Sequence, residues 1–206
     1  MIRTYTIGAA ALIVTLLAAL GWMAFWPRND DPFAPCRTSV VQGGLSSIGG
    51  PFTLVNSTGQ TVTDADVITM PTILYFGYTF CPDVCPLDNS RNALATEILE
   101  SNGIIVQPVF ISIDPRRDTP EVVGEFARVF HPRMIGLTGS EEQVRAASRA
   151  YRTYFAAQDT GDEYYLVDHS TFSYLVLPGH GTIEVFRHDM SAEDVARIAQ
   201  CFIEHA

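Results

Sequence analysis

The strongest fold signal in this sequence is the stretch TILYFGYTFCPDVCP, residues 72–86. Its first part, Thr72 to Phe76, is a run of β-branched and aromatic residues, which predicts a buried strand. Pro86 suits the first position of a helix, so we expect Cys85 at about the N-cap and Cys81 in the loop before it. A thiol in that position lies at the positive end of the helix dipole, which favours its thiolate.

Two cysteines four positions apart, held between prolines, can support two kinds of chemistry. They can close reversibly as a disulfide, or their thiolates can bind a soft metal such as Cu(I), zinc or the iron of an iron–sulfur cluster. Two thiolates alone leave a metal site incomplete, and a third ligand such as imidazole would favour copper. A purely structural disulfide is the simpler alternative for an exported pair. The spacing therefore predicts a redox or metal site without deciding between these uses.

On either side of this stretch, predicted strands alternate with predicted helices. Leu87, Leu94 and Ile98 recur at helical spacing, which predicts a helix after the cysteine loop. The alternation is typical of an α/β domain with a mixed sheet flanked by helices. A C-x-x-x-C loop between a strand and a helix is, by analogy, where thioredoxin-like folds keep a redox or metal site. The remaining strands are expected at 52–55, 60–62, 104–113, 134–137, 164–167, 172–177 and 182–186, and further helices are expected to begin at Asp118, Ser140 and Ser191.

The amino-terminal segment differs from the rest of the chain. Residues 7–26 carry no charge, and about 20 apolar helical residues are enough to cross a bilayer. Trp22 and Trp26 stand near the end of this run, where indoles favour the headgroup interface. We therefore expect a single transmembrane helix within residues 1–26, a linker over 27–48 and one folded domain over 49–206. A cleaved signal peptide is the alternative, although the bulky residues after Gly21 make a poor cleavage site.

Composition excludes several classes of protein. The 206 residues contain 13 Lys and Arg against 23 Asp and Glu, a net charge of −10, which argues against nucleic-acid binding. A hydrophobic content of 47% is too high for a disordered chain. Four cysteines are too few for a disulfide-dense small protein, so we expect them to serve chemistry or a single crosslink.

Three segments together resemble the Sco/SenC family. Residues 77–86, GYTFCPDVCP, are similar to its GxTxCPDVCP signature; residues 112–121, SIDPRRDTPE, and 165–170, YLVDHS, match two further family segments in the expected order. The resemblance extends from about Gly49 to the final helix. Members of this family are membrane-anchored, thioredoxin-like copper chaperones for cytochrome c oxidase assembly, so the resemblance implies that fold and that function.

The resemblance also implies a ligand set. In the family, copper is bound by two cysteines and one histidine, which correspond here to Cys81, Cys85 and His169. Two thiolates and one imidazole suit Cu(I), and can hold Cu(II) with an added weak ligand. Asp168 could fix the orientation of the His169 ring as its partner. Asp83 could tune the sulfurs or supply a weak oxygen ligand, and its alternative role is that of an acid at a helix start.

Cys36 and Cys201 depart from the common family pattern. They could form a disulfide that ties the linker to the terminal helix, closing a loop of 201 − 36 = 165 residues. Separate free thiols or an intermolecular bond are the alternatives.

The leading functional hypothesis is a metallochaperone that delivers copper to the CuA centre of the copper-centre subunit of cytochrome c oxidase. The alternatives are a thiol–disulfide oxidoreductase that reduces the cysteines of that centre, and a redox or copper sensor. Both main activities imply a thioredoxin-like reductant as partner, and the first also implies a copper donor. We expect the chain in a bacterial-type inner membrane with its carboxy-terminal domain in the periplasm, or in the mitochondrial inner membrane of a eukaryote.

Overall fold

The computed structural model describes the chain except for residues 1, 26–30, 38–44, 159–160 and 162–163. Two compact units divide at residue 34: Met1–Ala34 and Pro35–Ala206. Part of the predicted linker over 27–48, and Trp26 of the predicted anchor, lie outside the described residues. The described part of that linker contains two short 3₁₀ turns, η1 (Ala34–Cys36) and η2 (Leu45–Ser47).

The first unit contains the helix α1 (Ile2–Phe25). The side chains described between Leu12 and Leu20 are all exposed. In the part of the chain that the structure describes, no helix meets the length and apolarity needed to cross a membrane. The transmembrane anchor therefore stays a prediction.

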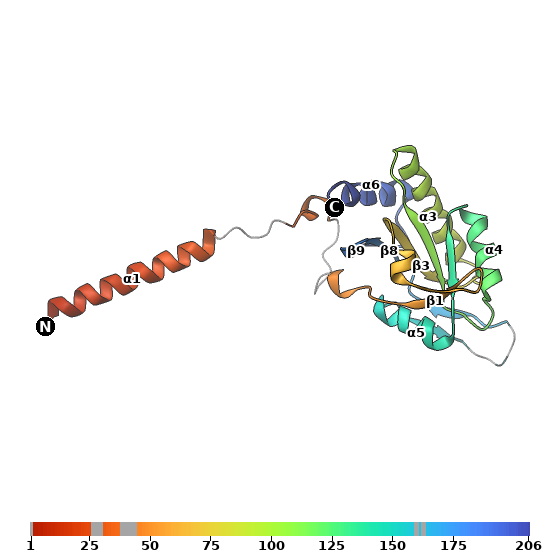
Figure 1. The fold of residues 1–206 in the computed structure, drawn as a ribbon, viewed down its shortest axis with the longest axis horizontal. Coiled ribbons are helices and arrows are strands. Elements are labelled where there is room, and N and C mark those ends of the chain that lie inside the picture. The colour runs from red at the N-terminus through yellow and green to blue at the C-terminus, as the bar shows by residue number, and fades with distance from the viewer. Residues whose placement is uncertain (1, 26–30, 38–44, 159–160, 162–163) are drawn as a thin grey trace. The chain divides into compact units, whose positions relative to one another are not determined.

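A mixed sheet of seven strands forms the centre of the second unit, in the order β2-β1-β5-β4-β3-β8-β9 (Figure 1). The three inner strands β5, β4 and β3 run parallel, β8 pairs antiparallel with β3, and β9 pairs antiparallel with β8. The predicted mixed α/β sheet is confirmed. The strands are β1 (Thr53–Asn56), β2 (Thr61–Thr63), β3 (Thr72–Gly77), β4 (Gln107–Ser112), β5 (Ile135–Thr138), β8 (Ser173–Leu177) and β9 (Gly181–Phe186).

Helices cover both faces of this sheet because successive side chains of each strand point to opposite faces. Phe110 of β4 stacks on Phe126 of α4, whereas Phe76 of β3 packs on Tyr151, which follows α5. Helices α3, α4 and α6 thus lie on one face and α5 on the other (Figure 1). The helices are α2 (Asp64–Val67), α3 (Val84–Ser101), α4 (Pro120–Phe130), α5 (Glu141–Ala150) and α6 (Ala192–Glu204).

A second, two-stranded sheet pairs β6 (Phe155–Ala157) with β7 (Val167–His169). The predicted strand at 164–167 is therefore displaced toward the carboxyl end. The sequence did not predict strand β6. Its three residues show no clear alternation of polar and apolar side chains, and so short a segment forms a strand only when a neighbouring strand supplies the hydrogen bonds. This small sheet places His169 at its end.

Helix starts follow local capping signals, with two corrections. Ser140 and Ser191 cap α5 and α6 as predicted. Thr119, not Asp118, caps α4, because the Thr119 hydroxyl accepts from the Val122 N–H. Helix α3 begins before Pro86, which stands in its first turn.

The apolar spacing used to predict α3 does not mark its buried face. Leu87 and Leu94 are exposed, whereas polar residues of the same helix are buried. Arg91 donates to Ser173 Oγ at 2.8 Å, and Asn92 donates to the same oxygen at 2.9 Å. These hydrogen bonds to β8 satisfy the polar groups that burial removes from water, so a polar face can pack against the sheet.

Candidate metal centre

The cysteine loop leaves the carboxyl end of β3 and enters α3. Gly77, the last residue of β3, lies so close to the helix that a Cβ atom there would be 2.9 Å from Cys85 Sγ and 2.8 Å from the Tyr75 ring. A side chain at this position would displace the sulfur or the ring. The glycine therefore lets the strand approach the helix closely enough to place Cys85 against the sheet.

Cys81 and Cys85 face each other across the first turn of α3. The backbone N–H of Cys85 donates to Cys81 Sγ at 3.4 Å. Cys85 is fully buried, whereas Cys81 keeps 7% of its surface exposed. Both are free thiols. The two sulfurs thus belong to one site, and Cys81 is the one nearer to solvent.

The two thiols differ in acidity. The pKa of Cys81 lies well below its usual range, first because the Cys85 thiol donates a hydrogen bond to its sulfur, and also because the N–H groups of Asp83 and Cys85 point at it. The pKa of Cys85 is raised, because its proton is held in that hydrogen bond and its sulfur is buried. The pair thus shares one proton, with the negative charge on Cys81.

His169 reaches this pair from β7. Its Nε2 atom lies 3.3 Å from Cys85 Sγ, and its Nδ1 atom lies 2.8 Å from the carbonyl oxygen of Ser170. The Val167 N–H donates to the Tyr78 hydroxyl at 3.3 Å, which ties β7 to the cysteine loop. Candidate ligand atoms of Cys81, Cys85 and His169 all lie within 4.8 Å of one another.

Neither aspartate proposed to assist these ligands belongs to the cluster of ligand atoms. Asp168 is exposed and accepts a hydrogen bond from Gln158 Nε2 at 2.8 Å, so the carbonyl of Ser170, not Asp168, contacts the His169 ring. Adjacent residues in a strand point to opposite faces, which explains the separation. Asp83 is the N-cap residue of α3 without a side-chain capping bond, and among the described residues the cluster includes no carboxylate.

Asp118, which the sequence predicted as the start of a helix, supports the cysteine loop instead. Its buried carboxylate accepts from Thr79 Oγ1 at 2.5 Å, from the Thr79 N–H at 3.1 Å and from Ser112 Oγ at 2.5 Å. These bonds fasten the cysteine loop to the end of β4. Burial raises the pKa of this carboxyl. The only available sequence signal was its place in the family-like segment 112–121.

Arg117 covers the same side of the loop. Its guanidinium lies 3.7 Å from the centre of the Tyr165 ring and 4.7 Å from that of Phe80, and its Nε donates to Asp114 Oδ2 at 2.5 Å. The Tyr165 hydroxyl donates to the other oxygen of Asp114 at 2.6 Å. Segments 112–121 and 165–170, which resemble family motifs, are thus joined around the cysteine loop.

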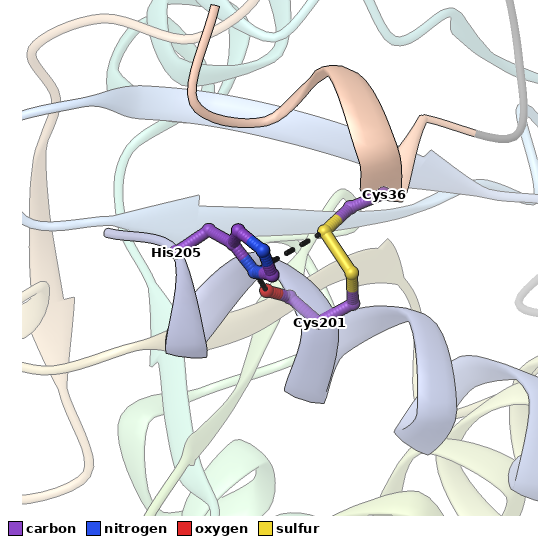
Figure 2. Close-up of side chains that lie close together, drawn as sticks. All are labelled: Cys36, Cys201 and His205. Carbon is purple, nitrogen blue, oxygen red and sulfur yellow. Dashed lines mark hydrogen bonds between the residues drawn. A yellow bond between two sulfur atoms is a disulfide. The ribbon is translucent and has the colours of Figure 1, made fainter.

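The other two cysteines form a disulfide between Cys36 and Cys201 (Figure 2). Of the three alternatives for these residues, the structure thus has the intramolecular pair. His205 lies beside this bond, with Nδ1 at 3.7 Å from Cys36 Sγ and 2.8 Å from the carbonyl oxygen of Cys201.

The Cys81, Cys85 and His169 arrangement can perform two kinds of chemistry. Two thiolates and an imidazole form a soft, three-ligand set that suits Cu(I). The same two sulfurs can also exchange with a disulfide, since a thiolate near solvent can attack and a neighbouring thiol can resolve the mixed disulfide.

Comparison with known proteins identifies the family. The chain matches the family described as SCO1/SenC over residues 41–204. It is 46% identical over 202 residues to Protein SenC of Rhodobacter capsulatus, covering 98% of this chain and 91% of that protein. The crystal structure of Arabidopsis thaliana ScoI with copper bound is 39% identical, with a TM-score of 0.71 over 76% of this chain and 99% of that one. Yeast Sco1 with copper bound is 37% identical, with a TM-score of 0.69 over 75% and 87%.

These likenesses extend along nearly the whole second unit, and they bear out the thioredoxin-like fold expected from the resemblance. Because the family match covers residues 41–204 and a relative is 46% identical over 98% of this chain, the chain belongs to the SCO1/SenC family.

Proposed function

We propose that this protein is a copper metallochaperone that binds one copper ion through Cys81, Cys85 and His169. The observation that carries the proposal is the meeting of these three ligands within 4.8 Å, although His169 is 84 positions from Cys85 in sequence. Two structural relatives of this chain are described with copper bound, which supports copper as the metal.

The chemistry of the ligands suits copper that must be bound and then released. Cu(I) is stable with three soft ligands, and the Cys81 thiolate at the edge of the site is the first sulfur that an arriving ion meets. Binding releases the proton that the two sulfurs share. Transfer to an acceptor proceeds by exchange of one ligand at a time. Cu(II) is held by the same residues with an additional weak ligand.

The acceptor in this proposal is the CuA centre of cytochrome c oxidase, and the chain is anchored in a membrane by its amino-terminal helix. The apolar composition of residues 7–26 supports the anchor. The body then lies on the periplasmic side of a bacterial inner membrane, or on the equivalent side of the mitochondrial inner membrane. A copper donor in the same compartment loads the site.

Thiol–disulfide exchange is a second candidate function, favoured by the difference between the two sulfurs. Cys81 keeps 7% of its surface exposed and holds the negative charge, as an attacking thiolate should, whereas Cys85 is fully buried, as suits a resolving thiol. In this function, a thioredoxin-like partner reduces the pair, and the pair in turn reduces the cysteines of the CuA centre. A pure dithiol reductant has no use for His169.

Copper binding by the reduced, full-length chain in detergent tests the proposal. Copper per chain and thiolate-to-copper charge-transfer absorption are measured for the wild type, for His169→Ala and for Cys81→Ser/Cys85→Ser. A matched control is His180→Ala, which removes an exposed histidine from the β8–β9 turn.

We expect one tightly held copper ion in the wild type and in His180→Ala, none at this site in the double variant, and an affinity about tenfold or more lower in His169→Ala. If His169→Ala binds copper as tightly as the wild type, the three-ligand site is contradicted and thiol–disulfide exchange becomes the leading candidate function.

A further inference from the structure

A second group of two cysteines and one histidine lies in the described part of the chain, away from the first. Candidate ligand atoms of Cys36, Cys201 and His205 all lie within 4.8 Å of one another. Figure 2 shows the His205 ring beside the disulfide, with a nitrogen directed toward Cys36 Sγ. The donor types are the same as in the first site: two sulfurs and one imidazole.

The backbone holds two of these residues in a metal-binding spacing. Cys201 stands in the last turn of α6 and His205 is its C-cap residue, four positions later. Residues at i and i+4 lie on one face of a helix, and helices use this spacing to offer two ligands to one metal ion. Cys36 supplies the third donor from the 3₁₀ turn η1.

The group is accessible from one side. Cys36 is buried, Cys201 is partly buried and His205 is exposed, so an ion can enter past the imidazole. The helix that carries Cys201 is held in place by its own buried face, which includes Ile198 and Phe202. This part of the site therefore persists when the disulfide opens.

The two groups lie at opposite ends of α3. Cys85 stands in the first turn of this helix, whereas the side chain of Asn102 at its other end bonds to Gln200, next to Cys201. A helix rises about 1.5 Å per residue, so these ends are roughly 25 Å apart. The second group therefore shares no ligand with the first and is an independent site.

We propose that reduction of the Cys36–Cys201 disulfide creates a second, redox-gated site for Cu(I). A dithiol reductant gives two electrons and two protons to the disulfide; the S–S bond breaks, two thiols form, and the reductant becomes a disulfide. Cu(I) then displaces both thiol protons to solvent and binds the two thiolates. The copper ion keeps its oxidation state in this step.

His205 completes the site by changing its tautomer. With the disulfide closed, Nδ1 lies within hydrogen-bond distance of the Cys201 carbonyl oxygen, so it carries the ring proton. Moving that proton to Nε2 frees the Nδ1 lone pair, and a rotation of the exposed ring turns this lone pair from the carbonyl oxygen toward Cys36 Sγ, which lies 3.7 Å from Nδ1. The closed form offers no thiolate charge, so it does not hold the ion. Three ligands suit Cu(I) better than zinc, which takes four.

The experiment uses the full-length chain in detergent, in a Cys81→Ser/Cys85→Ser background that removes the first site. One sample keeps its disulfide. The other is reduced with a water-soluble phosphine, which takes up oxygen from water as it opens the bond and is then removed under argon. Cu(I), supplied as its acetonitrile complex, is titrated against a chromophoric chelator, and copper K-edge absorption counts the sulfur and nitrogen ligands.

We expect one Cu(I) per reduced chain with two sulfur ligands and one nitrogen ligand, and none per oxidised chain. Adding His205→Ala should lower the affinity about tenfold or more, whereas adding the control His180→Ala should leave it unchanged. Adding Cys36→Ser/Cys201→Ser should abolish binding.

Equal copper in the reduced and oxidised samples would overturn the proposal, as would an affinity indifferent to His205. Either result would leave Cys36 and Cys201 as a structural disulfide only. Because the first site is absent throughout, these outcomes are independent of the metallochaperone proposal. Circular dichroism spectra of each variant verify that a loss of binding does not come from unfolding.

Discussion

The residues of the candidate metal centre gain their properties from a few close neighbours. Cys81 and Cys85 are the same residue type four positions apart, yet burial and one shared proton separate their acidities. The thiolate stands at the entrance and the thiol behind it. An arriving ion or disulfide therefore meets the reactive sulfur first.

This difference predicts selective alkylation of the reduced chain. Iodoacetamide should modify Cys81 faster than Cys85, as read by peptide mass spectrometry. Because its lowered pKa keeps Cys81 ionised, its rate should change less than about tenfold between about pH 8 and about pH 6, whereas an ordinary thiol slows by nearly a hundredfold. The variant Cys81→Ser is the negative control, because it lacks the thiol whose modification is measured. A steep fall in the rate at Cys81 would contradict the shared-proton arrangement.

Gly77 predicts a second effect at this scale. Gly77→Ala places a methyl group 2.9 Å from Cys85 Sγ, so the sulfur must move out of its position. We expect copper affinity to fall about tenfold or more, as for other changes that misplace a ligand. Gly21→Ala is the matched control, because a Cβ there meets nothing within 4 Å. Equal copper affinity in wild type and Gly77→Ala would show that the close approach is unimportant.

At the scale of elements, α3 shows how tertiary contacts override a hydrophobic pattern. Leu87 and Leu94 face solvent, whereas Arg91 and Asn92 are buried and find hydrogen-bond partners on β8 and just after β9. The buried Asp88 forms an ion pair with Arg91 at 3.0 Å. A polar face can be buried when each group is paired, and no periodicity in the sequence reports that pairing.

Two alanine variants of α3 test this packing. Asn92→Ala leaves the Ser173 hydroxyl and the Arg91 guanidinium short of a buried partner, which should lower the free energy of unfolding by about 1–3 kcal/mol. Leu94→Ala removes a larger but exposed side chain and should cost less than about 0.5 kcal/mol. Urea unfolding measures both. The reverse ranking would mean that the leucine face is the buried one.

At the scale of the whole molecule, one crosslink joins the start of the folded unit to its last helix. The Cys36–Cys201 disulfide spans 165 positions. Closing so long a loop removes many conformations from the unfolded chain, which stabilises the folded state.

Removing this crosslink should destabilise the fold. Cys36→Ser/Cys201→Ser should lower the free energy of unfolding by about 2–5 kcal/mol, measured by denaturant titration. Phosphine reduction of the wild type should have a similar effect, and the same treatment should leave the variant unchanged. If the reduced and oxidised wild type unfold at the same denaturant concentration, the disulfide does not contribute to stability.

The proposed membrane anchor also belongs to this scale. The full-length chain should remain with membranes after alkaline carbonate extraction. Val14→Asp/Leu17→Asp should release it, since each acid near the middle of a transmembrane helix costs about 3 kcal/mol. Val14→Leu/Leu17→Ile is the matched control and should stay in the membrane fraction. Release of the wild type by carbonate would contradict the anchor.

Local sequence signals were sufficient to predict many of the elements of this protein. The strand at Thr72, the cysteine loop and the helix caps at Ser140 and Ser191 all depend on residues within one turn or one strand, so their sequence predicted them. The strands expected at 52–55 and 60–62 are present in the same way as β1 and β2. Three ordered motifs then indicated the family and its ligands.

Other features depend on residues brought together over long distances. His169 could be chosen among five histidines only by family resemblance, because its contact with Cys85 depends on a hydrogen bond between β7 and the cysteine loop. Asp118 and the buried face of α3 likewise acquire their roles from partners on other elements. Capping and strand propensity act over a few residues, whereas these contacts require the sheet register and helix packing that exist only in the folded chain.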